Sequence, residues 1–365
     1  MSEKIHVALI MGGKSAEHEV SLQSAKNVYE ALDKDKYHII LIGIDHAGAW
    51  HWLEEGDFLN HPDDPKRISL KISDRRIVIS PNHPDEPFRE EATGRSIGRV
   101  DVVFPVLHGP LGEDGTIQGM FKILDLPFVG AGVLGSAVGM DKDVMKRLLR
   151  DAALPVGDFV VVSQKQTVAF EAIRERLGLP LFIKPANLGS SVGIHKVHHR
   201  QAFEAALRDA FQYDSKIILE AFIPGREIEC SVLGNESPIA SLPGEVIPRH
   251  EFYSYEAKYI DARGADLKIP ADLPQAIVEQ VQDLAIRAFR TLCCEGMARV
   301  DFFLQEDHRL YINEINTIPG FTRISMYPKL WEVSGLPYSS LIDRLIELAL
   351  ERHERERRLS SQMKF

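Results

Sequence analysis

Short apolar strands alternate with a helical pattern at the start of the chain. "KIHVALI" (4–10) precedes a helical pattern in "EVSLQSAKNVYEAL" (19–32), and "YHIILIGI" (37–44) follows it. After a stretch from about 46 to 98 that carries no recognisable motif, "DVVFPVLHG" (101–109) resumes the alternation. Strand–helix–strand units of this kind predict a parallel sheet covered by helices. We therefore expect an N-terminal parallel α/β domain over residues 1–140.

The pattern changes after a helix predicted in "MDKDVMKRLLRDA" (140–152). Four short apolar runs and two helical segments follow, and their lengths are typical of a small α+β unit with antiparallel strand pairs, which we place at residues 141–227. The remaining residues, 228–365, contain further strands and two long helical patterns, "PQAIVEQVQDLAIRAFRTL" (274–292) and "YSSLIDRLIELALERH" (338–353). We interpret the charged end, "ERHERERRLSSQMKF" (351–365), as a solvated helix terminus.

The composition excludes several classes of protein. The net charge of -10 argues against a general nucleic-acid binder, because nucleic-acid backbones are bound by clustered Lys and Arg. The first residues lack the apolar core of a signal peptide, and no apolar run approaches the ~18 residues of a membrane span. Three cysteines are too few for a disulfide framework or a four-cysteine zinc site. We expect a cytoplasmic protein that binds neither nucleic acid nor membrane.

Three oxygen-bearing side chains gather in "RVDFFLQEDHRLYINEIN" (299–316). In alternating strands Arg299 shares a face with Asp301, and Glu314 shares a face with Asn316. If the two strands pair as a hairpin, Asp301, Glu314 and Asn316 converge. Carboxylate and amide oxygens suit Mg2+ or Mn2+, which are usually bound together with nucleotide phosphates. The alternative, a polar solvent face of a hairpin, remains open at this point.

The stretch "GGKS" (12–15) resembles part of a P-loop, which would bind phosphate. That motif needs a glycine five residues before Gly13, and Ala8 stands there, so the interpretation fails. What remains is a tight turn followed by a helix start that carries Glu17, at the end of a strand where ligands commonly bind. A sharp turn with an acid that favours helix formation explains the same residues equally well.

A better phosphate site is "FIKPANLGSSVGIHKV" (182–197). A strand delivers Lys184, and the loop of Gly189, Ser190, Ser191 and Gly193 offers backbone amides and hydroxyls to phosphate oxygens. Lys142, at the head of the preceding helix, would face the same anion. An ordinary Gly-Ser hairpin is the competing interpretation.

A strand reaching Glu220 and a strand beginning at Glu227 are joined by a short link in "IILEAFIPGREIEC" (217–230). Such a link can offer its backbone to an adenine edge, with acids nearby for amino or ribose groups. An ordinary crossover between domains is the alternative.

Taken together, these motifs resemble the ATP-grasp fold, and their order resembles the D-alanine:D-alanine ligase family from residue 4 to about 350. The matching stretches are "GGKSAEHEVSLQSAKN", "VLHGPLGEDGTIQGM", "MDKDVMKRLLRDA", "KPANLGSSVG", "FYSYEAKYI", "MARVDFFL" and "INEINTIPGFT". The resemblance implies a three-domain ATP-grasp fold and the ATP-dependent ligation of two D-alanine molecules through an acyl phosphate, for peptidoglycan synthesis. It also implies a homodimer formed through the N-terminal region.

The resemblance assigns the ATP site residue by residue. Asp301, Glu314 and Asn316 would hold two Mg2+ (or Mn2+) ions on the phosphates. The phosphate oxygens would be bound by lysines and by serines of the Gly-rich loop, namely Lys142, Lys184, Lys258, Ser190 and Ser191. The nucleoside would be bound by Glu220, Ala221 and Glu227. Ala221 has no polar side chain, so only its backbone can contact adenine.

The resemblance also assigns the residues that would contact the two D-alanine molecules and the reacting atoms. Arg299 and the amide of Gly320 would stabilise the tetrahedral oxyanion. Glu17 would bind the ammonium of the first D-alanine, with His108 beside that substrate. Ser325, helped by Lys258, would bind the carboxylate of the second.

A bridge from Glu17 through Ser190 to Tyr259 would close the site. The Lys258–Tyr259 pair is typical of family members that use D-alanine as the second substrate, whereas those favouring D-lactate depart from it.

Two other functions compete with this one. Another ATP-grasp ligase would share the nucleotide residues but would not require Glu17, Tyr259 and Ser325. A nucleotide-binding regulator without chemistry would not require competent residues at each metal, phosphate and oxyanion position.

Overall fold

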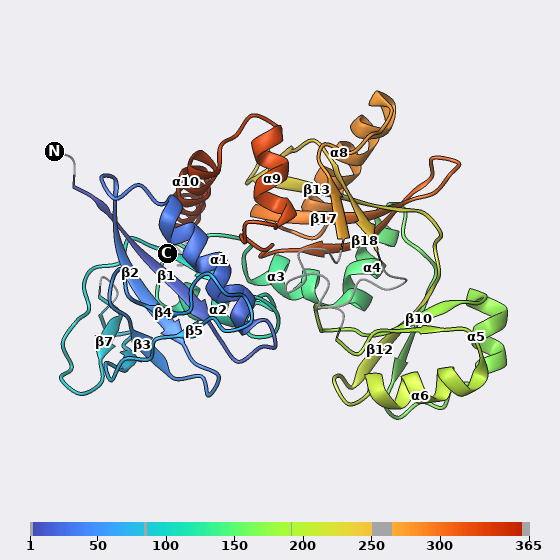
Figure 1. Ribbon diagram of the computed structural model, residues 1–365, viewed down its shortest axis with the longest axis horizontal. Helices are drawn as coiled ribbons and strands as arrows, with labels where there is room; N and C mark the ends of the chain where they lie inside the picture. The colour runs from blue at the N-terminus through green and yellow to red at the C-terminus, as the bar shows by residue number, and fades with distance from the viewer. Residues whose placement is uncertain (1–2, 84–85, 191, 250–264, 360–365) are drawn as a thin grey trace, which may run out of the picture.

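The computed structural model describes residues 3–83, 86–190, 192–249 and 265–359. Ser191, Lys258 and Tyr259, singled out above, lie outside these ranges. Three main sheets occupy separate parts of the molecule, and helices α3 (Val133–Met140) and α4 (Lys142–Asp151) lie between them (Figure 1). The mixed α/β architecture confirms the expected fold class.

The first sheet has the strand order β3-β2-β1-β8 and is formed by Trp50–Trp52, Tyr37–Ile44, Ile5–Gly12 and Val102–Val106. β1 pairs in parallel with β2 and with β8, as the alternating pattern predicted, and β3 adds an antiparallel edge. Helices α1 (His18–Ala31) and α2 (Thr116–Ile123) belong to this domain. Because all five residues from Val7 to Met11 are fully buried, β1 is the centre of the domain.

The turn after β1 depends on a glycine. Gly12 has φ +91°, and a Cβ atom there would lie 2.2 Å from the carbonyl oxygen of Ile44 on the neighbouring strand. A side chain at this position would therefore be excluded by both backbone conformation and space. The turn brings Glu17 to the carboxyl ends of the parallel strands, where α/β proteins commonly bind ligands.

The second sheet is antiparallel, with the order β11-β10-β12-β9. Its strands are His195–Val197, Leu181–Pro185, Lys216–Ala221 and Phe159–Ser163. Helices α5 (Phe170–Leu177) and α6 (Arg200–Ala210) cover one face of this sheet, and their apolar side chains form a separate core with it. Its strand pairs are antiparallel, as the sequence pattern predicted.

The third sheet has the order β16-β15-β13-β17-β18, with β14 beside β13. Its strands are Ala265–Lys268, Gly244–Pro248, Arg226–Gly234, Gly296–Leu304 and Leu310–Asn316, and β14 is Ile239–Ala240. Helix α8 (Gln275–Thr291) packs on it. β17 and β18 form the predicted hairpin, in which Asp301 lies opposite Glu314 and Arg299 opposite Asn316.

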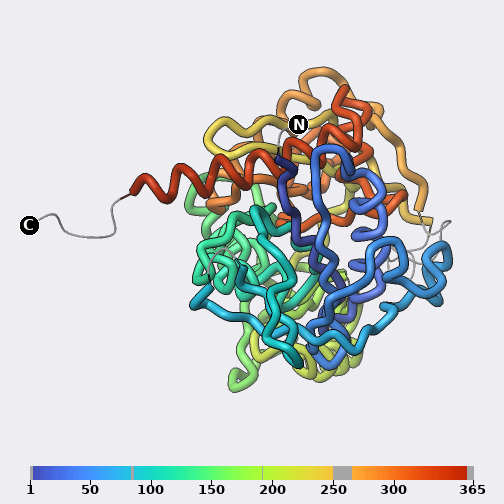
Figure 2. The backbone as a smooth tube through the Cα atoms, turned by 90° about the vertical axis from the view of Figure 1, so that its left-hand side faces the viewer, coloured from blue at the N-terminus to red at the C-terminus, as the bar shows by residue number. Residues whose placement is uncertain are grey.

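The C-terminal helices α9 (Met326–Val333) and α10 (Tyr338–Arg357) pack into the core of the first domain. Leu341, Leu345 and Ile346 join the same cluster as Val7 of β1 and Leu22 of α1. The end of α10 extends beyond the body of the molecule (Figure 2). The divisions at residues 140 and 227 stay predictions.

The interpretation of residues 351–365 as a solvated terminus is wrong for Arg352. This side chain is only 3% exposed, and its guanidinium donates to the carbonyl oxygens of Gly130 (2.5 Å) and Phe128 (2.7 Å). Arg352 therefore anchors α10 to the first domain. Charge alone suggested solvent, but the two backbone carbonyl oxygens that accept from Arg352 provide the compensation that a buried guanidinium needs.

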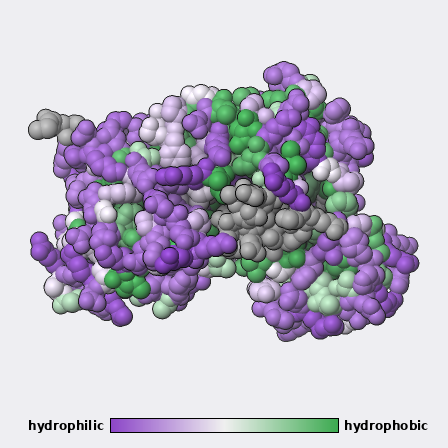
Figure 3. All heavy atoms as spheres, viewed as in Figure 1, coloured by the Kyte–Doolittle hydropathy of each residue, from purple (hydrophilic) through white to green (hydrophobic). Residues whose placement is uncertain are grey.

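The stretch from 46 to 98 forms, besides β3, two small hairpins that were not predicted. They consist of β4 (Leu59–Asn60) with β5 (Ser69–Leu70) and β6 (Ile77–Ile79) with β7 (Phe88–Glu90). Hydrophilic residues dominate the first domain on the face shown in Figure 3. Among the described residues, no helix is both long and apolar enough to cross a membrane.

Candidate active site

A cavity of about 310 Å³ lies where the three sheets meet. Its lining contains every predicted site residue that falls within the described ranges: Glu17, His108, Lys142, Lys184, Ser190, Glu220, Ala221, Glu227, Arg299, Asp301, Glu314, Asn316, Gly320 and Ser325. These residues span almost 310 positions in the sequence. A single cavity that gathers them all makes this the candidate active site.

Three lysines and two glutamates form a charged cluster on one wall. Lys184 of β10 pairs with Glu220 Oε2 at 2.7 Å, and Lys146 of α4 pairs with Glu220 Oε1 at 3.1 Å. Lys142 donates to the carbonyl oxygen of Leu188 at 2.7 Å and lies 3.7 Å from Glu314. On this wall three ammonium groups face two carboxylates, and a local excess of positive charge favours an anionic ligand.

Burial alone would raise the pKa of Glu220, but the ammonium groups of Lys146 and Lys184 outweigh it and lower the pKa to about 2. Burial would likewise lower the pKa of Lys184, and the carboxylates of Glu220 and Glu314 reverse this and raise it. For Lys146 burial prevails and its pKa is lowered. The cluster therefore presents Glu220 as a carboxylate and Lys184 as a cation.

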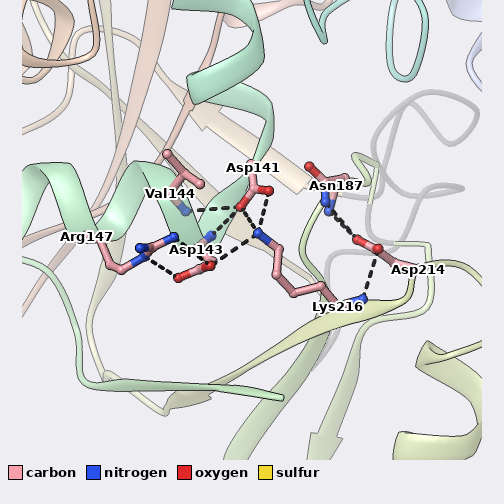
Figure 4. A network of polar contacts seen from close by, with 7 residues as sticks. All are labelled: Asp141, Asp143, Val144, Arg147, Asn187, Asp214 and Lys216. Atoms are coloured by element: carbon pink, nitrogen blue, oxygen red, sulfur yellow. Dashed lines mark hydrogen bonds and ion pairs between the residues drawn. The ribbon is translucent and has the colours of Figure 1, made fainter. Parts of the chain in front are cut away.

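A network of polar contacts surrounds the start of helix α4, which carries Lys142 and Lys146 (Figure 4). Asp141 caps helix α4 by accepting from the amides of Asp143 (3.1 Å) and Val144 (3.0 Å). The ammonium of Lys216 lies between the carboxylates of Asp141 and Asp143, at 2.5 Å and 3.2 Å. Since Lys142 is the first residue of α4, this network fixes it relative to the second sheet.

The same network reaches the Gly-rich loop. Asp214 accepts from both the amide and the side chain of Asn187, at 2.8 Å and 3.0 Å, and from the amide of Lys216. Asn187 directly precedes the loop that contains Gly189 and Ser190. One group of acids thus holds both parts of the proposed phosphate site.

Arg299 lies among acids on the third sheet. Its guanidinium makes a two-pronged contact with Asp301, with both N–O distances at 2.7 Å, and its Nε lies 2.8 Å from Glu229. Asn316 donates to Asp301 at 3.0 Å. This pairing of planar guanidinium with planar carboxylate fixes the orientation of Arg299.

The oxygen donors on β17 and β18 fit a magnesium site in their chemistry. Asp301 and Glu314 are directly paired across the hairpin, with Asn316 two residues further. Two carboxylates and one amide are the hard, mixed set that Mg2+ shares with nucleotide phosphates. In the described part of the chain, no three His, Cys, Asp or Glu residues are grouped to hold a metal by themselves. A metal here would therefore depend on Asn316 and on the nucleotide.

The first-domain wall of the cavity carries Glu17 and His108. The hydroxyl of Ser190 donates to Glu17 Oε1, so the Gly-rich loop and the first domain are in direct contact. His108 is buried, its Nδ1 lies 3.0 Å from the carbonyl oxygen of Ile318, and its Nε2 lies 3.2 Å from the hydroxyl of Ser24. Two of the three expected members of the bridge therefore meet; the third, Tyr259, lies outside the described residues.

Gly320 and Ser325 lie together after β18. A Cβ atom on Gly320 would be 2.8 Å from the hydroxyl oxygen of Ser325, so the two residues approach closely. Ser325 directly precedes α9 as its N-cap residue, and its hydroxyl accepts from the amide of Thr322 at 3.0 Å. The geometry places a hydroxyl and a helix N-terminus beside the Pro-Gly turn, which is a favourable environment for an anion.

Sequence reasoning missed four charged residues of the cavity: Glu113, Lys146, Lys196 and Glu229. Lys146 could have been found, because it follows Lys142 by one helical turn and so shares its face. Glu229 follows Glu227 by two residues on a strand, and the same periodicity applies. Glu113 carries no local signal, since its loop had no predicted structure.

Family models and relatives agree with this site. The model described as "D-ala D-ala ligase N-terminus" matches residues 6–131, and "D-ala D-ala ligase C-terminus" matches residues 148–347. The chain is 56% identical over 360 residues to the D-alanine–D-alanine ligase of Shouchella clausii, covering 98% of each chain.

Solved structures give the same result. The D-alanine–D-alanine ligase of Coxiella burnetii superposes with a TM-score of 0.84 at 40% identity, covering 98% of this chain and 97% of that one. The VanG D-Ala:D-Ser ligase of Enterococcus faecalis also gives a TM-score of 0.84, at 38% identity, covering 95% of this chain and all of that one.

Proposed function

The chain belongs to the D-alanine–D-alanine ligase family, and we propose how its residues divide the work of that reaction. Its activity is the ATP-dependent joining of two D-alanine molecules into D-alanyl-D-alanine for peptidoglycan synthesis. The observation that carries the proposal is that the lysine wall, the oxygen donors of β17 and β18, and Arg299 with the Pro-Gly turn all line one cavity.

The first D-alanine would bind by its ammonium group to Glu17, with His108 beside it. Glu17 is only 7% exposed and already accepts from Ser190. A buried carboxylate gains much from a cationic partner, which gives selectivity for an amino acid with a free amine. Closure of Tyr259 onto Ser190 is part of the proposal, and it would exclude water from the activated acyl group.

ATP would bind between the second and third sheets. Lys142, Lys184 and Lys258 would neutralise phosphate oxygens, Ser190 and Ser191 would cap them, and the base and ribose would contact Glu220, Ala221 and Glu227. Mg2+ or Mn2+ held by Asp301, Glu314 and Asn316 would supply further positive charge. Lys146 shares Glu220 with Lys184, so we add it as a residue that orients this wall.

Transfer of the γ-phosphoryl group to the D-alanine carboxylate would give an acyl phosphate and ADP. The amine of the second D-alanine, held through its carboxylate by Ser325 and Lys258, would attack the acyl carbon. Arg299 and the amide of Gly320 would stabilise the oxyanion of the tetrahedral intermediate, and its collapse would release phosphate. Attack on an unactivated carboxylate would have to expel one of its oxygens, which is a much poorer leaving group than phosphate.

The fate of the carboxylate oxygens tests the acyl phosphate. With D-alanine labelled with 18O in its carboxyl group, one labelled oxygen per turnover should appear in the released phosphate, because the bridging oxygen leaves with phosphorus. Unlabelled phosphate, detected by mass spectrometry alongside labelled dipeptide, would rule out this intermediate.

We further propose a homodimer formed through the N-terminal region and a cytoplasmic location. Both rest on the family alone. The cytoplasm supplies the ATP that the reaction consumes, and light scattering of the purified protein measures the oligomeric state directly.

A further inference from the structure

The turn that carries Gly320 is bound by side chains from the first domain. The amide of Ile318 donates to Glu113 Oε1 at 3.1 Å, and the carbonyl oxygen of Ile318 accepts from His108 Nδ1 at 3.0 Å. Both backbone polar groups of Ile318 are thus held by residues more than 200 positions away in the sequence. Such contacts fix a backbone more tightly than sequence neighbours can.

The other end of the turn is held in the same way. The amide of Phe321 donates to the Ser24 hydroxyl at 3.1 Å, and its carbonyl oxygen accepts from Asn27 at 2.9 Å. Ser24 and Asn27 belong to α1, one helical turn apart. Pro319 and Gly320 therefore lie between two anchored residues, and we call residues 318–321 the anchored turn.

The donors and acceptors of this arrangement are mutually consistent. Burial lowers the pKa of His108, so its imidazole is neutral near pH 7. Since a carbonyl oxygen only accepts, Nδ1 carries the proton, and Nε2 accepts from the Ser24 hydroxyl, whose oxygen accepts from Phe321. Both halves of the anchored turn are thereby joined through one imidazole.

Glu113 connects the anchored turn to the first-substrate site. Its second oxygen, Oε2, accepts from the amide of Gly109 at 2.6 Å. Gly109 lies against Glu17, because a Cβ atom there would be 2.6 Å from Glu17 Oε2. The loop from His108 to Glu113 therefore touches both the acid proposed to bind the first D-alanine and the turn that carries Gly320.

We propose that Glu113 is a positioning residue, which fixes the amide of Gly320 in the oxyanion site by holding the backbone of Ile318. The inference rests on the proposed role of Gly320 in D-alanyl-D-alanine formation. An oxyanion donor is effective only within about 0.5 Å of its productive position. A contact that immobilises the neighbouring backbone therefore acts on the rate of the chemical step and leaves nucleotide binding unchanged.

The test compares Glu113→Gln with Asp114→Asn in the full-length protein. Both replace an acid of the same loop by its amide. Among the described residues, Asp114 accepts from the amides of Leu111 and Thr116 and makes no hydrogen bond to the anchored turn. The side-chain oxygen of glutamine can accept from one of the two backbone amides held by Glu113. Its NH2 group is a donor and cannot accept from the other amide. For Glu113→Gln we expect kcat to fall about 10- to 100-fold, part of the loss caused by deleting an oxyanion donor.

A second readout separates positioning from general damage. A phosphinate dipeptide that mimics the tetrahedral intermediate should lose affinity in proportion to kcat, whereas the KM for ATP should match that of Asp114→Asn. A kcat within twofold of Asp114→Asn would overturn the inference, as would equal losses of affinity for ATP and for the phosphinate.

If Glu113→Gln does not fold, Ser24→Ala provides the test, because Ser24 accepts from the amide of Phe321 at the other end of the anchored turn. It should lower kcat about 10-fold with an unchanged KM for ATP, in keeping with partial loss of one anchor, and an unchanged kcat would contradict the inference. The wild-type protein separates this result from the function itself. If the wild type forms no dipeptide, the proposed function is wrong. If the wild type is active and the variants are equally active, only the proposed role of Glu113 is wrong.

Discussion

At the scale of single residues, the site is built from charges that already have partners. Arg299 is held by Asp301 and Glu229, and Lys184 by Glu220, so each cation is oriented before any ligand arrives. Preorganised charges need no rearrangement when negative charge develops during the reaction. These charges lie on strands of the second and third sheets, so the site exists only in the folded chain.

Arg299→Lys tests whether orientation, beyond charge, matters at the oxyanion. Lysine keeps a cation beside Glu229 and Asp301 but cannot form the two-pronged contact. We expect kcat to fall about 100-fold or more, while the Kd for ATP changes less than threefold, because the oxyanion exists only during reaction. Stopped-flow turnover and equilibrium ATP titration measure the two quantities. Equal losses in both would assign Arg299 to nucleotide binding.

At the scale of elements, the β17–β18 hairpin shows what sequence reasoning can achieve. Period-two alternation was sufficient to predict that Arg299 shares a face with Asp301, and Glu314 with Asn316, because strand geometry is fixed by the backbone. The expected pairing of the two strands as a hairpin then brings Asp301 opposite Glu314. The lysine partners of Glu220 could not be predicted, since Lys146 and Lys184 come from different elements that only the tertiary fold brings together. Local periodicity identifies the face of an element but not its neighbour in space.

The hairpin also provides the metal test. Asp301→Asn and Glu314→Gln each remove one carboxylate ligand, so we expect the half-saturating Mg2+ concentration to rise about tenfold or more. Asp307→Asn, at the exposed turn of the same hairpin, is the control. Titrations of activity against Mg2+ at fixed ATP give the comparison, and unchanged Mg2+ dependence would remove either residue from the metal site.

At the scale of the whole molecule, the first domain and the end of the chain form one unit. Helix α10 completes the first-domain core, Arg352 anchors it, and Glu113 reaches the turn after β18. None of these contacts follows from sequence patterns, because each joins segments more than 200 residues apart. The motif-bearing elements were predictable, whereas the contacts that register the domains against one another required the structure.

The contact made by Glu113 has a consequence for stability. Burial, with the Glu17 carboxylate nearby, raises the pKa of Glu113 to about 8. Between roughly pH 5 and 8 the native state therefore keeps a proton that the unfolded chain releases, so the free energy of unfolding falls as pH rises. The glutamine of Glu113→Gln cannot titrate. We therefore expect the free energy of unfolding of this variant to fall with pH less steeply than that of the wild type, by up to about 1.4 kcal/mol per pH unit. Urea unfolding across this range measures it; parallel curves would contradict a raised pKa.

The most direct test of the central claim is the identity of the product. The purified protein is supplied with Mg-ATP and D-alanine, alone and in competition with D-serine and D-lactate, and products are identified by mass while ADP is measured. The account predicts one ADP per D-alanyl-D-alanine and predominance of that dipeptide in each mixture. A main product that carries D-serine or D-lactate, or ATP binding without dipeptide formation, would contradict it.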